Sequence, residues 1–297
     1  MLKHFAHNEQ QDQIFVVDLF SSNSFSTNIS NAAAENHFNT LSDEYDEELD
    51  PLAIESFYQE AIESPAAPIL QDIVDTQELP NNQVPEEIFA LMAAAFVRVP
   101  RMINAQNDFN AQIMKKAMWY MARDDGMFEE IQRTHPNVNR EVLKQLIDED
   151  LLEIKIDQNY LLSTAVSLIG KVLEILPQRN WGLAKSTEDH KLILSGAPLS
   201  CTWSTPTRGP YSPALGILNT TVIFPLCPQL CLLGTFEPID SSITIPQGDV
   251  ANINTRTASC STRFLYASGL DFQLELPESE IGNWEDYAKL IAKHQKK

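Results

Sequence analysis

The chain of 297 residues has few basic side chains, with 21 Lys and Arg against 41 Asp and Glu. Its formal net charge of -20 at pH 7 argues against bulk affinity for nucleic acid phosphates or for anionic membrane surfaces, because like charges repel. The imbalance is concentrated in residues 1–80, which contain sixteen acidic residues and one basic residue, Lys3. The kind of macromolecule that this charge favours is a protein partner with a basic surface.

Cysteine is also scarce, and the four that occur all lie in the last third of the chain: Cys201, Cys227, Cys231 and Cys260. This density and spacing differ from those of a disulfide-held secreted domain, so we expect reduced thiols. Polar and titratable residues interrupt the first nine positions, where a secretory signal needs a continuous apolar stretch. No window reaches the run of about 18 apolar residues that a membrane span requires. We therefore expect a cytoplasmic protein that does not cross a membrane.

The short motifs of common catalytic sites are missing. Ala165 stands where a phosphate-binding loop ending at Gly170 would need its first glycine, so P-loop chemistry is not expected. A nucleophile elbow around Ser195 would need glycine at two positions that Ile193 and Ala197 occupy. No spacing among the many carboxylates of residues 1–80 singles out an acid and base pair.

Two segments invite a metal-binding interpretation, and neither has the required pattern. The acidic run at 42–50 lacks the glycine and the distal glutamate of an EF-hand, so a solvated loop is expected there. Cys227 and Cys231 are separated by three residues in an apolar run, without a second pair or a nearby histidine. We expect both thiols to be buried, reduced and free of metal. The sequence predicts no metal and no cofactor.

Helical patterns dominate the chain up to residue 176. A β-branched and aromatic run at 13–20 predicts a first strand, and residues 51–74 predict two short helices interrupted by prolines. Residues 88–97 carry no charged or hydrogen-bonding side chain, which predicts a core helix buried on nearly all sides.

Pro100 is expected to break this helix, with helical character resuming over residues 101–123. Two further helices are expected over residues 139–150 and 161–176. The second carries Lys171 and Glu174, and its charges and length argue against a membrane span.

From residue 177 onward the apolar runs become short and β-like, separated by proline, glycine and asparagine. Strands are expected at residues 191–194, 220–224, 230–233 and 262–266, with a corner from Pro225 to Pro228. A capped amphipathic helix beginning at Asn283 closes the chain. These patterns predict an α+β fold, in which a helical middle packs on a mostly antiparallel sheet that the N-terminal strand joins. We expect one domain over residues 1–297, with an acidic part (1–80), a helical core (81–176) and a β-rich part (177–297).

The order of several short segments resembles the family known as domain of unknown function 4238, found mainly in bacteria. Residues 2–6 and the strand after them look like the family's Tyr-Leu-Arg-Arg-Phe opening, and the ending at Arg98 to Arg101 looks like its Arg-Thr-Pro. Trp181 is similar to the tryptophan that precedes its sheet. Residues 191–198 resemble its strand ending in Thr/Ser-Asp-Asn-Pro, residues 223–228 resemble Phe-Pro-Leu-Ser-Pro, and residues 252–266 resemble its closing asparagine and strand.

The chain departs from the family's pattern in two places. The His-Tyr-Val-Pro-Gln segment that usually comes first is absent, and Gly196 and Ala197 replace an aspartate and an asparagine. We expect Gly196 to permit a turn that a side chain would block, and a cleft at this turn to lack a metal-binding carboxylate. The resemblance implies an architecture and no activity.

Three functional hypotheses follow. The first is a non-catalytic binding or interaction protein, favoured by the missing catalytic patterns. The second is a hydrolase or nuclease, in bacterial defence, in which Arg98 and Arg101 clamp a phosphate or carboxylate beside Ser195; the alternative role of both arginines is to cap the end of their helix. The third is a structural subunit of a homo-oligomer, since the sequence leaves the oligomeric state open. The candidate binding residues are Arg98, Arg101, Trp181 and Ser195.

Overall fold

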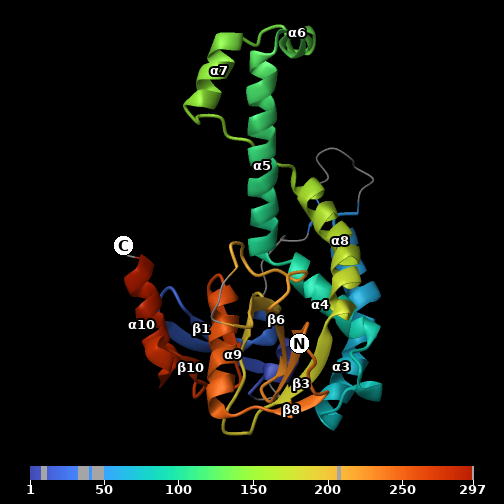
Figure 1. The fold of residues 1–297 in the computed structure, drawn as a ribbon, viewed down its shortest axis with the longest axis vertical. Helices are drawn as coiled ribbons and strands as arrows, with labels where there is room; N and C mark the ends of the chain where they lie inside the picture. Colours follow the sequence, from blue (N-terminus) through green and yellow to red (C-terminus); the bar gives the residue numbers. More distant parts are fainter. Residues whose placement is uncertain (8–11, 33–39, 42–49, 206–208, 296–297) are drawn as a thin grey trace.

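The computed structural model describes residues 1–7, 12–32, 40–41, 50–205 and 209–295, and it has the expected α+β architecture (Figure 1). The acidic run at 42–49 lies outside these residues. The α-helices are α1 Ile29–Ala32, α2 Ala53–Phe57, α3 Ser64–Thr76, α4 Glu86–Val97, α5 Pro100–Arg123, α6 Asp125–Thr134, α7 Arg140–Asp148, α8 Gln158–Ile175, α9 Gln247–Cys260 and α10 Trp284–Gln295. Short 3₁₀ turns occur at Leu2–Phe5, Pro80–Asn82, Leu176–Gln178 and Pro277–Ser279.

The larger sheet has five strands in the order β5-β6-β7-β3-β8. These are β3 Asn180–Lys185, β5 Ser200–Trp203, β6 Thr220–Cys227, β7 Leu230–Thr235 and β8 Ser242–Thr244. Neighbouring strands are antiparallel, except that β3 and β8 run parallel. The corner expected from Pro225 is wrong, because Pro225 lies within β6, next to a bulge before Cys227. A proline is tolerated beside a bulge because the ladder is already interrupted there.

Both faces of this sheet are covered, since successive side chains of a strand point to opposite faces. Phe224 and Leu232 belong to the core cluster that includes the helices α3, α4 and α8. Their neighbours Ile223 and Cys231 belong to a separate cluster with α9. The central strands β6 and β7 are therefore buried between helical layers.

The smaller sheet has the order β2-β1-β9-β4 and is antiparallel throughout. Its strands are β1 Gln13–Asp18, β2 Asn23–Asn28, β4 Leu194–Ser195 and β9 Phe264–Ala267, and β10 Leu274–Glu275 pairs separately with β11 Ile281–Gly282. The N-terminal strand β1 joins the C-terminal strand β9, as expected.

The strand expected over residues 191–194 is reduced to the two residues of β4. The side chain of Asn254 on α9 forms hydrogen bonds with backbone groups that would otherwise bond to a neighbouring strand. Its Oδ1 accepts from the backbone N–H of Ile193 (3.0 Å), and its Nδ2 donates to the carbonyl of Lys191 (2.8 Å).

Several helix predictions are confirmed. Eight of the ten residues from 88 to 97 are buried on α4. The break comes at Arg98 and Val99, where α4 and α5 meet at a bend of 57°. Asn283 accepts a hydrogen bond from the backbone N–H of Asp286 (3.0 Å) and so caps α10.

Other helix predictions are wrong. Residues 53–76 form one continuous helical stretch rather than two short helices, with a π-helical segment at Tyr58–Glu63 between α2 and α3. Neither proline breaks the stretch: Pro65 directly follows the π-helical segment in the first turn of α3, and Pro68 lies inside α3. The helices α6 and α9 were not expected.

The helix α8 is longer than the sequence pattern indicated. With the following turn it spans Gln158–Gln178, and its most apolar window has a mean hydropathy of 1.4, enough to cross a membrane by length and composition. The bent pair α4 and α5 passes the same test. This corrects the argument from length and charge, although one face of α8 packs into the core through Leu161, Ala165 and Ile169, and core helices are apolar for the same reason.

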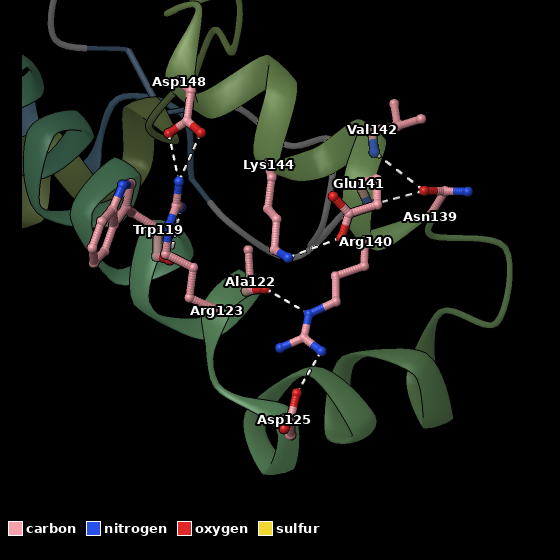
Figure 2. A network of polar contacts seen from close by, with 10 residues as sticks. All are labelled: Trp119, Ala122, Arg123, Asp125, Asn139, Arg140, Glu141, Val142, Lys144 and Asp148. Carbon is pink, nitrogen blue, oxygen red and sulfur yellow. Dashed lines mark hydrogen bonds and ion pairs between the residues drawn. The ribbon is translucent and has the colours of Figure 1, made fainter.

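The long helix α5 projects from the body of the molecule and carries α6 and α7 at its far end (Figure 1). Figure 2 shows the polar contacts that hold this tip together. Arg140 on α7 donates to the carbonyl of Ala122 (2.8 Å) and pairs with Asp125 (2.6 Å). Arg123 donates to both carboxylate oxygens of Asp148 (2.7 Å each).

Candidate functional site

A cleft of 1040 Å³ opens where the base of α5 meets β5 and the end of α9. The lining side chains come from several elements that are far apart in the sequence. They include Phe96, Val99, Arg101, Met102, Ala105, Ala197, Leu199, Cys201, Thr202, Trp203, Ser204, Thr205, Tyr211, Arg256, Ser259 and Cys260, with the segment 209–213 on one side. A smaller pocket of 590 Å³ between α9 and α10 is mostly apolar, so the larger cleft is the better candidate for recognition of a polar ligand.

The charge of this cleft is opposite to that of the whole chain. Among the described residues that line it, Arg101 and Arg256 are the charged side chains, and none is an aspartate, glutamate or histidine. The chain as a whole has a net charge of -20. Two guanidinium groups without a carboxylate in the lining favour an anionic ligand.

Arg256 is held in position by β5. Its Nη1 donates to the hydroxyl of Thr202 (2.5 Å), and the carbonyl of Trp203 lies 3.5 Å away. Burial lowers the pKa of Arg256, and the nearby Glu275 opposes this shift. Arginine remains protonated at neutral pH even so, and the hydrogen bonds orient its guanidinium at the cleft wall.

Arg101 approaches the same cleft from another direction. It is the second residue of α5, directly after Pro100, and its side chain is exposed. It interacts with the thiol of Cys260, and this interaction partly opposes the rise in the pKa of that thiol caused by burial. Arg101 and Arg256 therefore reach one space from two different helices.

The two thiols of the cleft are half-buried and free. Burial raises the pKa of Cys201, and the nearby Thr220 and Arg179 oppose the shift. Because the pKa of Cys260 is raised as well, both groups are neutral thiols near pH 7 rather than thiolate nucleophiles. They add small, weakly polar surface to the cleft.

Two of the residues nominated from the sequence lie outside the cleft. Arg98 caps the end of α4, pairs with Glu63 (2.5 Å) and stacks over the ring of Tyr58 at 5.6 Å. Trp181 on β3 donates from its indole to the carbonyl of Leu176 (2.9 Å) and packs edge-on against Phe89. Both side chains link core elements to one another.

Ser195 is the last residue of β4, and its hydroxyl bonds within the turn that follows, beside the cleft. It donates to the carbonyl of Ala197 (2.9 Å) and accepts from the backbone N–H of the same residue (3.2 Å). The expectation that Gly196 is needed for the turn is wrong: its φ is not positive, and an added Cβ would meet no atom within 4 Å. Ala197, where the family has asparagine, contributes to the cleft wall.

Outside the cleft, Cys227 and Cys231 are free, buried thiols. Burial raises the pKa of Cys231 to about 12, which disfavours the thiolate that zinc would require. Within the described residues, no group of three or more His, Cys, Asp and Glu side chains is placed to hold a metal ion. The metal-free state of these thiols stays a prediction.

Arg256, Trp203 and the two thiols of the cleft were not nominated from the sequence. Arg256 was missed because α9 was not recognised as a helix. Val250, Ile253 and Ala258 are buried at helical spacing, and this periodicity was the available signal. It was weakened by the many polar residues between these positions.

Comparison with known proteins gives one match. The family described as "Protein of unknown function (DUF4238)" matches residues 1–269. No curated protein and no solved structure matches the chain.

Proposed function

The chain belongs to the DUF4238 family, whose description assigns no activity, and from its site we propose that it is a binding protein that takes a small anionic ligand in the cleft between α5, β5 and α9. The proposal depends on one observation above all. Arg101 and Arg256 line the same space without an acidic side chain among the described lining residues. A guanidinium group binds phosphate, sulfate or carboxylate oxygens through two parallel hydrogen bonds.

The remaining lining limits the kind of ligand. Trp203, Tyr211 and Met102 provide aromatic and apolar surface beside the arginines. The volume of 1040 Å³ is at the upper end of the range for small-molecule sites, which is about 300–1,000 Å³. These features favour an anion attached to a planar or apolar group over a bare inorganic ion.

A binding role also agrees with the state of the nucleophilic side chains near the cleft. The hydroxyl of Ser195 is engaged in its own turn, and the raised pKa values of Cys201 and Cys260 keep these thiols protonated. Free thiols are consistent with a reducing, cytoplasmic compartment, which we propose as the place of action. The net charge of -20 supports the further proposal of a protein partner with a basic surface.

The test is a calorimetric titration with pyrophosphate, with adenosine monophosphate and with uncharged adenosine. We expect adenosine monophosphate to bind most tightly, pyrophosphate to bind more weakly because it lacks a planar group, and adenosine to bind more weakly because it lacks the anion. Arg101→Ala and Arg256→Ala should each weaken binding by about tenfold or more, since one charge-assisted hydrogen bond contributes about 1.5–3 kcal/mol. Arg133→Ala is the matched control, because Arg133 lies on α6 and pairs with Glu130 at the surface.

Arg256→Lys separates charge from structure, because it keeps the positive charge while losing the orienting geometry. Binding that is equal in the native protein and in both alanine variants would overturn the proposal. The proposal would also be overturned if none of the charged compounds bound to the native protein. Thermal melting of the variants at the native temperature shows that a loss of binding is not a loss of folding.

A further inference from the structure

One face of the projecting helix α5 is exposed along most of its length. Its central line, called here the α5 seam, consists of Ala105, Asp108, Gln112, Lys116 and Trp119, all of them exposed. The spacing of three and four residues places these side chains in one row along a helix. Beside the row lie Phe109, Ile113 and Tyr120, which are 63%, 49% and 56% exposed.

Near its far end, α5 contacts α7 and the segment that follows α7. Ala122 is buried there, and Lys115 pairs with Asp150 (2.5 Å) on the segment that follows α7. Arg123 pairs with Asp148 at the end of α7 and covers one face of the Trp119 ring at 4.1 Å. Arg123 lies one turn beyond Trp119 on the line of the seam, so α7 borders the seam at this end, while the five seam residues themselves stay exposed.

We infer that the α5 seam binds a second copy of this chain, as an antiparallel helix pair related by a two-fold axis at Gln112. The seam is symmetric about this residue: Asp108 and Lys116 lie four residues on either side, and Ala105 and Trp119 lie seven. In an antiparallel pair, Asp108 of each copy then meets Lys116 of the other, and the small Ala105 meets the large Trp119. A two-fold interface needs this kind of self-complementary pattern.

The charged pair supplies the strongest support. Asp108 and Lys116 are both exposed, and within the described part of the chain neither forms an ion pair. On α5 they are eight residues apart, too far to pair with each other. In the antiparallel arrangement each Asp108 faces Lys116 of the other copy, so the dimer contains two such ion pairs.

The apolar side chains beside the seam fit the same arrangement. The two-fold axis places the flanking rows of both copies on the same side of the helix pair. Phe109 of one copy then lies within about one turn of Ile113 of the other, at the 1.5 Å rise per residue of a helix. Their exposed surface becomes buried, which drives association of helices in water.

The pairing also reaches the cleft, although the inference does not depend on the proposed ligand. Ala105 lines the cleft and is the seam residue opposite Trp119 of the second copy. The dimer therefore brings an aromatic side chain from each copy to the rim of the other copy's cleft.

Light scattering coupled to size exclusion, over a range of protein concentrations, tests this inference. The native chain is expected at twice its mass of 33.4 kDa. Asp108→Lys and Lys116→Asp should each shift the dimer towards monomer by at least about tenfold in dissociation constant, because each reversal creates two like-charge contacts. An equimolar mixture of the two variants should recover the dimer, since every contact in the mixed pair is again between opposite charges.

The double variant Asp108→Lys with Lys116→Asp should also recover the dimer. Lys171→Asp is the control, because Lys171 is an exposed lysine on a different helix, α8. Circular dichroism confirms that the variants keep their helices. A native chain that is monomeric at high concentration overturns the inference, as does a dimer that both single reversals leave intact or a mixture that stays monomeric.

Discussion

At the scale of single residues, the most consequential charge lies at the end of β1. Asp18 is buried, and its carboxylate accepts hydrogen bonds from Nε (3.1 Å) and Nη2 (2.7 Å) of Arg263. It also accepts from the backbone N–H of Phe20 (3.0 Å). These contacts, and the one with Arg263 most of all, lower the pKa of Asp18 from 3.8 to about 2. The pair joins β1 to the start of β9, and so the N-terminal strand to the C-terminal part of the chain.

Asp18→Asn should make the stability of the fold depend differently on pH. The pKa of Asp18 is lower in the folded chain than in the unfolded chain, so its carboxylate contributes stability above about pH 4 that is lost as the pH falls towards 2. At pH 7 the free energy of unfolding of the variant is expected to be about 2 kcal/mol lower than that of the native chain. The difference should shrink between pH 4 and pH 2 in urea unfolding measurements. The exposed Glu130→Gln is the control, and a difference that is constant with pH would contradict the assignment.

At the scale of elements, a buried arginine fastens the larger sheet. Arg179, directly before β3, donates to the carbonyls of Leu215 (2.6 Å), Thr220 (2.7 Å) and Gly234 (3.1 Å) and to the hydroxyl of Thr220 (2.7 Å). Its guanidinium also stacks over the ring of Phe236 at 4.3 Å. These contacts join the start of β3 to β6, to β7 and to the loop before β6. Burial lowers the pKa of Arg179, and the carbonyl groups compensate for the lost water.

Arg179→Lys should be strongly destabilising although it keeps the charge. A lysine ammonium has three donors at one point and lacks the planar fork, so buried carbonyls are left without donors. We expect the free energy of unfolding to fall by about 2–4 kcal/mol. Urea unfolding monitored by circular dichroism measures this, with Arg133→Lys on the exposed face of α6 as the control. A loss below about 0.5 kcal/mol would mean that the carbonyls find other donors.

Elements with one dominant local signal were predictable from the sequence. The helix α4 follows from ten apolar positions in a row, and β1 follows from a short β-branched run. The strand at 191–194 was overestimated because its backbone groups bond to Asn254, which lies 61 and 63 residues further along the chain, and such a tertiary contact leaves no local pattern. The candidate site shows the same limit.

Arg98 and Arg101 are three residues apart in the sequence, and only the direction of the break between α4 and α5 decides which of them faces the cleft. The break turns Arg98 towards Glu63 and Arg101 towards Cys260. The second arginine of the cleft, Arg256, comes from a helix whose polar surface concealed its period.

At the scale of the whole molecule, the structure consists of a body that contains the sheets and an arm, made of α5, α6 and α7, that projects from it (Figure 1). Along α5 and α6, the described residues that are fully buried are Ala122 and Phe128. The tip is held instead by polar contacts (Figure 2). Local stability follows buried apolar surface, so the tip should open more easily than the strands β6 and β7.

Arg140→Ala tests this division of stability. Arg140 donates to the carbonyl of Ala122, pairs with Asp125, and stacks over the ring of Phe128 at 5.2 Å. Its removal should lower the free energy of local opening of the tip by about 1–2 kcal/mol. This corresponds to an increase of about tenfold in the equilibrium constant for opening of α6 and α7. Native-state hydrogen exchange should therefore show faster exchange of amides in these two helices, with those of β6 and β7 unchanged. Arg133 also lies at the tip, where it pairs with Glu130 of the same helix, so Arg133→Ala should leave hydrogen exchange in both regions unchanged. Equal acceleration in the body and the tip would instead mean that the arm and the sheets unfold as one cooperative unit.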